Sequence, residues 1–387
     1  MAPLLGGYLA FGQYWGVWVV VLIDFLNANH LSIGRLGLQL AALSVVSILT
    51  MTLLAPRLQS LPLSVTIPLA LAAMGLGAFL VAVLPQQWIV VAFAVLGVGN
   101  GLIDVFLNVA AQGVEMRTRK PTLQRLHAFY SIGGITGALG AGIASVVGVS
   151  YRVCLVAASL CLMAAAAWNL FAVGVRAQPR TARGDTKVSV TVLFRTRSLI
   201  APALVVLFAF FVEGSMDIWS VTYLRRTLEA TALVGGISFA VFSASMAVGR
   251  LSAGRILFGL GYRRTIQVSG VGALLAGVAA TITSSSVVAG IAFLFLGFFI
   301  ASAAPAAFGL VGGSGESPTL AIAAMTTVGY AGFVVGPPIM GWLAQTAGLR
   351  ATMALIAVAT IGVAAGGMIG TGSSPEAGLS GDDPAED

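Results

Sequence analysis

Five carboxylates stand inside hydrophobic stretches of a chain that otherwise carries few charges. Four of them fall in two clusters, one in each half of the chain: Asp104 with Glu115, and Glu213 with Asp217; the fifth is Asp24. A carboxylate in a membrane span costs roughly 2.5–3.5 kcal/mol, so it usually lines a water-filled path, pairs with another group or carries a proton. The two clusters favour a polar, proton-binding cavity shared by two halves of a membrane protein.

A stripe of polar side chains surrounds the first cluster. Its members are Asn100, Asp104, Asn108, Gln112 and Glu115. At about 100° per residue they fall within about 120° of one another on one helix face. The functional interpretation is a cavity wall that binds a polar solute and protons, and it is favoured for Asp104 and Asn108, which are expected near mid-membrane. The alternative is hydrogen bonding between spans, worth about 0.6 kcal/mol per contact.

The second cluster places Glu213 and Asp217 four residues apart, on one face of a helix. Like charges at this spacing repel each other, which is typical of a carboxylate that binds and releases a proton. Asp217 could instead bond to neighbouring backbone or to Ser220. Trp219 could stack on a sugar ring or lie in the aromatic belt at the membrane surface.

Three further polar residues are expected near the ends of spans. Glu115, next to basic residues at the predicted cytoplasmic end, could act in a gate or form an ion pair in a loop. His127 could be a partner in a cytoplasmic gate, although a solvated loop histidine is favoured. Asp24 is expected toward the outer end, where a rim or helix-end interaction is favoured over proton coupling.

The composition indicates that membrane-spanning helices position these residues. The 387 residues are 58% hydrophobic and 9% charged, with a mean hydropathy of +0.99, whereas a soluble domain carries about 25% charged residues. Apolar runs long enough to cross a bilayer recur along the chain, and the 48 glycines suit helices packed closely in lipid. The twelve expected spans are 4–26, 37–55, 63–84, 88–114, 124–148, 152–174, 198–223, 231–257, 265–283, 287–311, 319–345 and 349–371.

The distribution of basic residues sets the expected orientation. With a cytoplasmic N-terminus, all but five of the 20 lysines and arginines fall in inside loops. The five outside are Arg35, Arg152, Arg225, Arg226 and Arg350. This is the positive-inside bias with both termini cytoplasmic. This orientation accounts for the excess of basic over acidic residues, so we expect no nucleic acid partner.

A basic polar stretch separates six expected spans from six others. The predicted divisions are an N-terminal six-helix bundle over 1–175, a cytoplasmic linker over 176–197, a C-terminal six-helix bundle over 198–371 and a disordered acidic tail over 372–387. The halves also echo each other in sequence, with Trp18 corresponding to Trp219. Parallel repeats of this kind are one transporter plan, in which the solute binds between the halves near the midplane.

The chain offers no pattern for metal, cofactor or enzyme chemistry. Cys154 and Cys161 lie seven residues apart on one expected helix, about 10 Å along its axis, too far for a disulfide. No Walker A sequence, zinc-type Cys/His cluster or G-x-S-x-G elbow occurs. We therefore expect no metal, no cofactor and no enzymatic activity.

Twelve spans in two halves with a basic linker resemble the major facilitator superfamily over about residues 5–371. The sequence GRLSAGR over 249–255 is similar to the cytoplasmic loop signature of that superfamily, here between spans eight and nine. This resemblance makes Arg250 and Arg255 gating candidates. The counterpart between spans two and three, APRL over 55–58, lacks the usual aspartate and paired basic residues.

Other stretches resemble the branch that neighbours the fucose/galactose/glucose:proton symporters and includes many bacterial inner-membrane members. They are NGLIDVFLN over 100–108, HAFYSIGG over 127–134 and EGSMDIWS over 213–220. The resemblance implies that Asp104, Asn108 and Glu213 face a central cavity. Gly137-Ala138 stands where drug antiporters carry a Gly-Pro pair, which favours symport or uniport over drug efflux.

We therefore expect an all-α membrane protein with twelve spans in two pseudo-symmetric bundles. It would act as a monomer in the bacterial inner membrane, moving a small polar, sugar-like solute together with protons by alternating access. Asp104 and Glu213 would carry protons or bind hydroxyl groups, and Asn108 and Gln112 would donate hydrogen bonds. The alternatives are proton-driven efflux of an amphipathic compound and a non-transporting receptor.

Overall fold

The computed structural model describes residues 1–119, 122–171, 193, 195–313 and 317–369. Within these residues the chain is helical, with short turns between helices and no strand, which confirms the predicted all-α class. Apart from a few residues at its C-terminal edge, the predicted linker over 176–197 lies outside the described residues, as does the predicted tail over 372–387.

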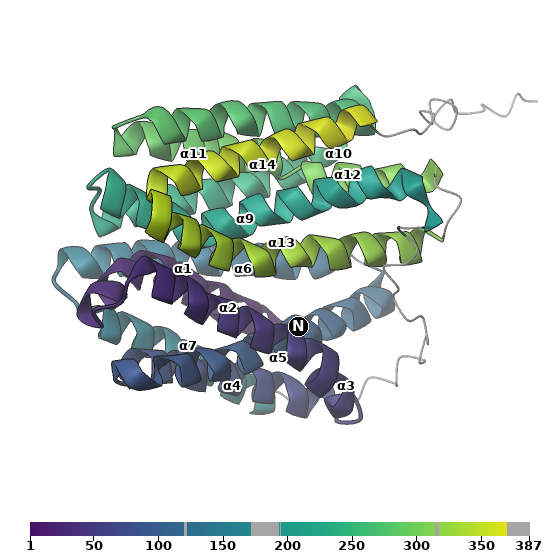
Figure 1. The fold of residues 1–387 in the computed structure, drawn as a ribbon. Helices are drawn as coiled ribbons and strands as arrows, with labels where there is room; N and C mark the ends of the chain where they lie inside the picture. Colours follow the sequence, from purple (N-terminus) through teal and green to yellow (C-terminus); the bar gives the residue numbers. More distant parts are fainter. Residues whose placement is uncertain (120–121, 172–192, 194, 314–316, 370–387) are drawn as a thin grey trace, which may run out of the picture.

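The first bundle occupies the lower half of Figure 1, coloured from purple to blue. Its helices are α1 (Ala2–Ala28), α2 (Ile33–Leu49), α3 (Ala55–Leu58), α4 (Leu63–Val83), α5 (Ile89–Thr118), α6 (Thr122–Val146) and α7 (Tyr151–Phe171), with a π-helical turn at Thr50–Leu54 and a 3-10 turn at Gln86–Trp88. Helix α1 packs against α6 and α7, and it also touches the second bundle. Residues on α1 can therefore act between the bundles.

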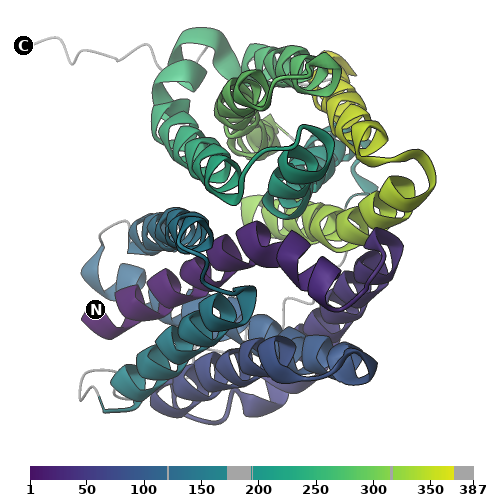
Figure 2. The same ribbon diagram turned by 90° about the vertical axis from the view of Figure 1, so that its left-hand side faces the viewer.

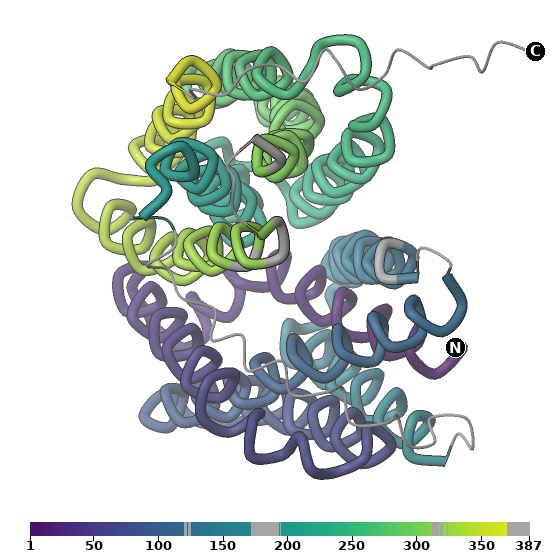
Figure 3. The backbone as a smooth tube through the Cα atoms, turned by 90° about the vertical axis from the view of Figure 1, so that its right-hand side faces the viewer, coloured from purple at the N-terminus to yellow at the C-terminus, as the bar shows by residue number. Residues whose placement is uncertain are grey.

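The second bundle lies above the first, coloured from teal to yellow, and Figures 2 and 3 show the same division from the two ends of the molecule. Its helices are α9 (Ile200–Thr227), α10 (Ala232–Ile282), α11 (Ser286–Ile300), α12 (Ala303–Gly309), α13 (Pro318–Ala347) and α14 (Leu349–Ile369), with 3-10 turns at Arg197–Leu199 and Leu310–Gly313. Helix α9 packs on α13 and α14, and α10 packs on α11 and α14.

Eleven helices of the described chain are long and apolar enough to cross a membrane, one fewer than the twelve spans expected. The difference lies in α10, whose 51 residues include both expected spans 231–257 and 265–283. At 1.5 Å per residue this length is far more than the roughly 30 Å that a bilayer core requires. Gly261 interrupts the helix with φ 72° and ψ 167°, a conformation that glycine adopts at little cost. Two spans therefore meet at Gly261.

Small residues let α1 and α6 approach closely in the first bundle. A Cβ atom built on Gly12 would collide with the backbone oxygen of Tyr130, and one on Gly16 would collide with that of Gly134. This is the packing that small residues provide between helices in lipid. It holds Tyr130 and its neighbours on α6 at a fixed height beside α1.

The two bundles meet near the end of the molecule where α1 finishes, which we call the Asp24 end. There α2 packs on α13, and α6 packs on the first part of α10. A Cβ on Gly37 would lie 2.9 Å from the Cα of Gly341, and one on Gly236 would lie 2.6 Å from the oxygen of Ala138. At these two points the bundles touch through backbone atoms.

Candidate functional site

Asn108 gathers three helices of the first bundle around its side-chain oxygen. The Tyr8 hydroxyl on α1 donates to Asn108 Oδ1 at 2.9 Å, and His127 Nε2 on α6 lies 3.2 Å from the same oxygen. Asn108 Nδ2 donates to the backbone oxygen of Asp104 at 2.7 Å. The rings of Tyr8 and His127 meet edge to face, with centroids 5.4 Å apart. The Asn108 side chain was expected to bind solute, but most of its hydrogen-bonding capacity is used within the protein.

The Asp104 carboxyl, one turn before Asn108, forms no hydrogen bond or ion pair with any described residue. Its side chain is partly exposed. It lies within electrostatic range of Tyr8 and Tyr130 in its own bundle and of Tyr330 on α13. Asp104 is thus an unpaired acid that faces groups of both bundles.

The remaining residues of the predicted stripe differ in their roles. Asn100 Nδ2 lies 3.4 Å from the hydroxyl of Ser47 and ties α5 to α2 inside the first bundle. Gln112 is exposed. Glu115 Oε2 accepts a hydrogen bond from the backbone nitrogen of Thr122 at 2.9 Å, at the first turn of α6. The stripe is therefore not one continuous wall, because Asn100 and Glu115 join helices within the bundle.

The second bundle contributes an ion pair and a second unpaired acid. Arg250 Nη2 lies 2.7 Å from Glu213 Oε1, with the Glu213 side chain 19% exposed and that of Arg250 47% exposed. Asp217, one turn further along α9, is partly exposed and lies within electrostatic range of both. It has no hydrogen bond or ion pair among the described residues. Glu213 is thus neutralised by Arg250, while Asp217 is not.

The position of Arg250 corrects a prediction. The resemblance to the loop signature placed Arg250 and Arg255 between two spans, whereas both lie within the long helix α10, inside the expected span 231–257. The signature begins more than two turns before the break at Gly261, so its first arginine remains on the helix and reaches Glu213. Arg255 is exposed.

The burial of Trp219 and Ser220 bears on two interpretations of the C-terminal cluster. Trp219 is completely buried, so it neither stacks on a solute in this conformation nor lies in an exposed aromatic belt. The hydroxyl of Ser220 is buried without a hydrogen-bond partner among the described residues, so it does not bind Asp217. Both side chains pack in the core of the second bundle.

Tyrosines that the sequence interpretation missed connect the two acid clusters. Tyr130 on α6 lies within electrostatic range of Asp104, Asp217, Glu213 and Arg250. Tyr330 on α13 lies within the same range of Asp104, Glu213 and Tyr8. The signal in the sequence was a phenol inside a span, whose hydroxyl group needs a polar partner. The site therefore combines acids, one arginine, one histidine and phenol groups from both bundles.

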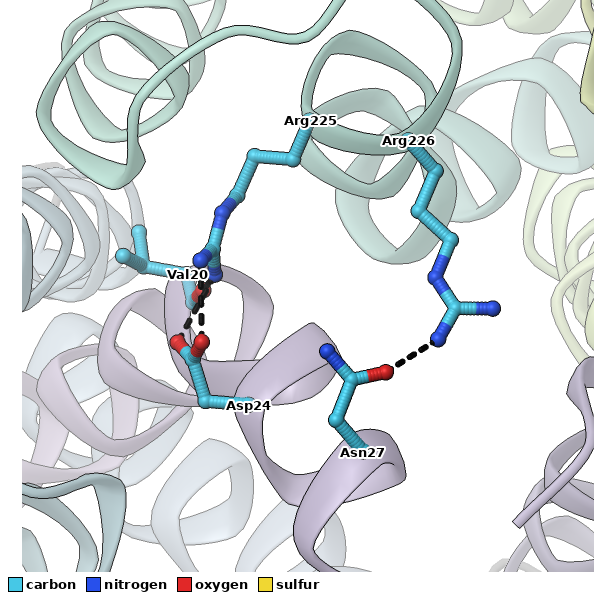
Figure 4. A network of polar contacts seen from close by, with 5 residues as sticks. All are labelled: Val20, Asp24, Asn27, Arg225 and Arg226. Atoms are coloured by element: carbon cyan, nitrogen blue, oxygen red, sulfur yellow. Dashed lines mark hydrogen bonds and ion pairs between the residues drawn. The ribbon is translucent and has the colours of Figure 1, made fainter. Parts of the chain in front are cut away.

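A separate polar contact joins the bundles at the Asp24 end, as Figure 4 shows. Arg225 on α9 makes a bidentate ion pair with Asp24 on α1, at 2.8 and 2.9 Å. It also donates to the backbone oxygen of Val20 at 2.8 Å. Arg226 donates to Asn27 Oδ1 at 2.6 Å. We call these contacts the Asp24 clasp. They place Asp24 in the interaction near a helix end that the sequence favoured.

The described residues contain no cluster of three or more side chains suited to hold a metal ion. Cys154 is buried, Cys161 is partly buried, and both are free thiols.

The sequence profile of the Major Facilitator Superfamily matches residues 4–318. The chain belongs to this superfamily. The predicted membership is confirmed, and the match covers both acid clusters of the site. Members of this superfamily are transporters, and the protein is accordingly a multi-pass membrane protein with the fold described above.

Similar proteins extend over nearly the whole chain. An uncharacterized MFS-type transporter of Yersinia pestis is 28% identical over 350 residues, 89% of each chain. Among solved structures, the nucleoside transporter NupG has a TM-score of 0.75 at 13% identity, covering 95% of this chain and 98% of that one. The fucose:proton symporter of E. coli has a TM-score of 0.61 at 14% identity, covering 95% and 97%. At these identities the structural likeness shows the fold alone.

Proposed function

We propose that this protein is a proton-coupled transporter of a small polar, sugar-like solute that works by alternating access. The observation that carries the proposal is a pair of unpaired acids, Asp104 in the first bundle and Asp217 in the second. Tyr130 lies within electrostatic range of both. A carboxyl group in a membrane span that lacks a partner is suited to carry a proton.

The ion pair changes which acid we assign to the second bundle. Glu213 is held by Arg250 at 2.7 Å, and removing the charge of Glu213 would leave the guanidinium group of Arg250 without its ion-pair partner. Asp217 has no such partner among the described residues. Asp217 therefore takes the proton-carrying role that the sequence gave to Glu213, while Glu213 and Arg250 remain as polar groups for the solute.

Protonation of the two acids would reduce the cost of closing the site. When the bundles rock and exclude water, a charged carboxylate loses its hydration, whereas a neutral carboxyl loses much less. Proton binding at Asp104 and Asp217 would thus favour the closed intermediate that carries solute across the midplane. The related fold of the fucose:proton symporter and of the nucleoside transporter NupG suggests fucose and nucleosides as first solutes to test.

We further place the protein in the bacterial inner membrane as a monomer, with both termini in the cytoplasm. The basic residues near the expected inside loops support this orientation. The Asp24 end then faces outward, and the contacts between the bundles lie on the outer side.

The test is proton movement in proteoliposomes that contain a pH-sensitive dye, with fucose and uridine in a panel of sugars and nucleosides. We expect a solute-dependent pH change that is lost in Asp104→Asn and Asp217→Asn. The matched control is Glu229→Gln, an exposed acid in the turn between α9 and α10, which should retain the signal. Solute transport with unchanged proton movement in both Asp variants would exclude coupling through these acids. Transport of amphipathic drugs alone would favour efflux.

A further inference from the structure

The orientation of the Asn108 amide is fixed by its neighbours. Asn108 Nδ2 lies 2.7 Å from the backbone oxygen of Asp104, and a carbonyl oxygen only accepts hydrogen bonds. The rotated amide would place two oxygen atoms at that distance, with no proton between them. The amide oxygen of Asn108 must therefore face Tyr8 and His127.

This orientation fixes the proton of His127. Because Asn108 Oδ1 carries no hydrogen, His127 Nε2 at 3.2 Å must donate. A neutral imidazole has one donor and one acceptor nitrogen, so Nδ1 is then the acceptor. The His127 side chain is exposed, and its only hydrogen bond to a described residue is the one to Asn108. Nδ1 of His127 is therefore a hydrogen-bond acceptor that is not used by any described residue.

Hydrogen-bond donors approach the same region from the second bundle. Helix α10 packs antiparallel on α6, with Gly236 beside Ala138 and Phe239 beside Gly134. This register brings the Arg250 end of α10 toward the first turns of α6, where His127 lies, and the charges of Arg250 and Glu213 act on His127. Arg250 uses Nη2 to bind Glu213 at 2.7 Å, and nearly half of its side chain remains exposed. A guanidinium group has five N–H donors, so donors remain for another oxygen atom.

We propose that His127 Nδ1 and the Arg250 guanidinium form a subsite between the bundles for one hydroxyl group of a neutral, polyhydroxylated solute. The hydroxyl proton is donated to His127 Nδ1, and the hydroxyl oxygen accepts from Arg250. Tyr8 and Asn108 are positioning residues that hold the imidazole in this tautomer. The inference rests on the proposed function, since it names the solute group that the same site recognises.

The subsite predicts a preference between solutes. A hydroxyl group donates and accepts at once, whereas a carboxylate or phosphate oxygen has no proton to give to Nδ1. An anion would also meet Asp104 and Asp217, which have no cationic partner among the described residues. The subsite therefore favours neutral solutes that carry hydroxyl groups over their phosphorylated forms.

The first test observes the tautomer directly. The chain has two histidines, and His30→Asn removes the other one at a position with φ 50°, which asparagine tolerates. We would record nitrogen NMR spectra of ¹⁵N-histidine-labelled full-length protein in lipid nanodiscs at pH 8.5. This pH is about two units above the ordinary pKa of imidazole. We expect a protonated Nε2 and an unprotonated Nδ1.

Two variants show whether Asn108 sets this state. Asn108→Leu should give a mixture of both tautomers, because no acceptor then selects Nε2–H. Asn100→Leu is the matched control, since this amide on the same helix bonds to Ser47 and not to His127, and it should leave the spectrum unchanged. A protonated Nδ1 in the parent protein, or an unchanged spectrum in Asn108→Leu, would overturn the proposal.

The second test adds solute to the labelled protein. The probes are fucose, uridine and, as an anionic probe, uridine monophosphate. We expect a neutral probe that drives proton movement to shift the Nδ1 resonance, and uridine monophosphate to shift it much less. A transported neutral probe that leaves Nδ1 unmoved would overturn the subsite. If no probe in the panel moved protons, the proposed function would fail, while the tautomer experiment would still decide how His127 is held.

Discussion

Replacing Asp24 by asparagine should loosen the contact between the bundles at the Asp24 end. The variant keeps the size of the side chain but removes the charge that binds Arg225 at 2.8 and 2.9 Å. The Asp24 side chain is 38% exposed and that of Arg225 is 14% exposed, so solvent screens part of the interaction. Exposed pairs contribute about 0.2–1 kcal/mol and breaking a buried pair costs about 3–5 kcal/mol. We expect the contact between the bundles to lose about 1–2 kcal/mol of stability, closer to the value for exposed pairs than to that for buried pairs.

In the open state the two groups separate and are hydrated, so this loss falls on the closed state alone. A change of 1.4 kcal/mol corresponds to about tenfold in an equilibrium constant. Asp24→Asn should therefore raise the fraction of molecules open at the Asp24 end by about tenfold. The remaining bond from Arg225 to the backbone oxygen of Val20 keeps the closed state populated.

A single cysteine can report this fraction. Val20 is completely buried, and its side chain lies 3.4 Å from the position of a Cβ on Gly236 in the second bundle. Val20→Cys, with Cys154 and Cys161 replaced by alanine, would be labelled by a membrane-impermeant thiol reagent only when the Asp24 end opens. We expect Asp24→Asn to increase the labelling rate by about tenfold.

The matched control for this experiment is Arg350→Gln. Arg350 lies at the same end of the molecule but donates to the backbone oxygens of Thr281 and Thr283 within its own bundle. Removing its charge should leave the labelling rate of Val20→Cys unchanged. If Asp24→Asn changed the rate by less than about twofold, the clasp would not stabilise the closed state and the reasoning would be refuted.

Three further variants test other parts of the structure. Arg250→Gln leaves the Glu213 carboxylate unpaired and should lower the free energy of unfolding, measured by calorimetry, by about 1–3 kcal/mol. Adding Glu213→Gln should restore most of this loss, and no restoration would contradict the pairing. Gly34→Cys with Gln345→Cys should form a disulfide that blocks transport until reductant is added, because their Cβ positions lie 3.2 Å apart. Trp219→Phe should leave KM within about twofold, since Trp219 is completely buried; a tenfold rise would show that it reaches the solute.

The helical class and most span positions follow from apolar run lengths, because a membrane span must bond its own backbone and stay apolar. The exception is the pair of spans over 231–283, which form one long helix interrupted at Gly261. Their polar connection contains a basic sequence typical of a loop, yet basic side chains also suit the end of a helix at a membrane surface. The apolar runs therefore located both spans correctly, but they predicted a loop where the chain forms one helix interrupted at Gly261.

The candidate site was predictable in part. The unpaired acids Asp104 and Asp217 stand out in the sequence because charge is rare in a span. The ion pair of Glu213 with Arg250 was hidden, because the partners are separated along the chain and no periodicity relates them. The burial of Trp219 was hidden for the same reason, since the face that a helix turns toward its neighbours depends on the packing of the whole bundle.

The backbone contacts of Gly37 with Gly341 and of Gly236 with Ala138 have a kinetic consequence. Where bundles interlock through long side chains, separation requires many rotamers to leave their pockets, and each adds to the activation barrier. At these glycines the bundles touch through backbone, so parting them there withdraws few side chains. The barrier to reorientation then depends mainly on a small number of polar bonds. The turnover rate should consequently change strongly when one of those polar bonds is removed. It should change only weakly when side-chain volume is altered elsewhere in the contact between the bundles.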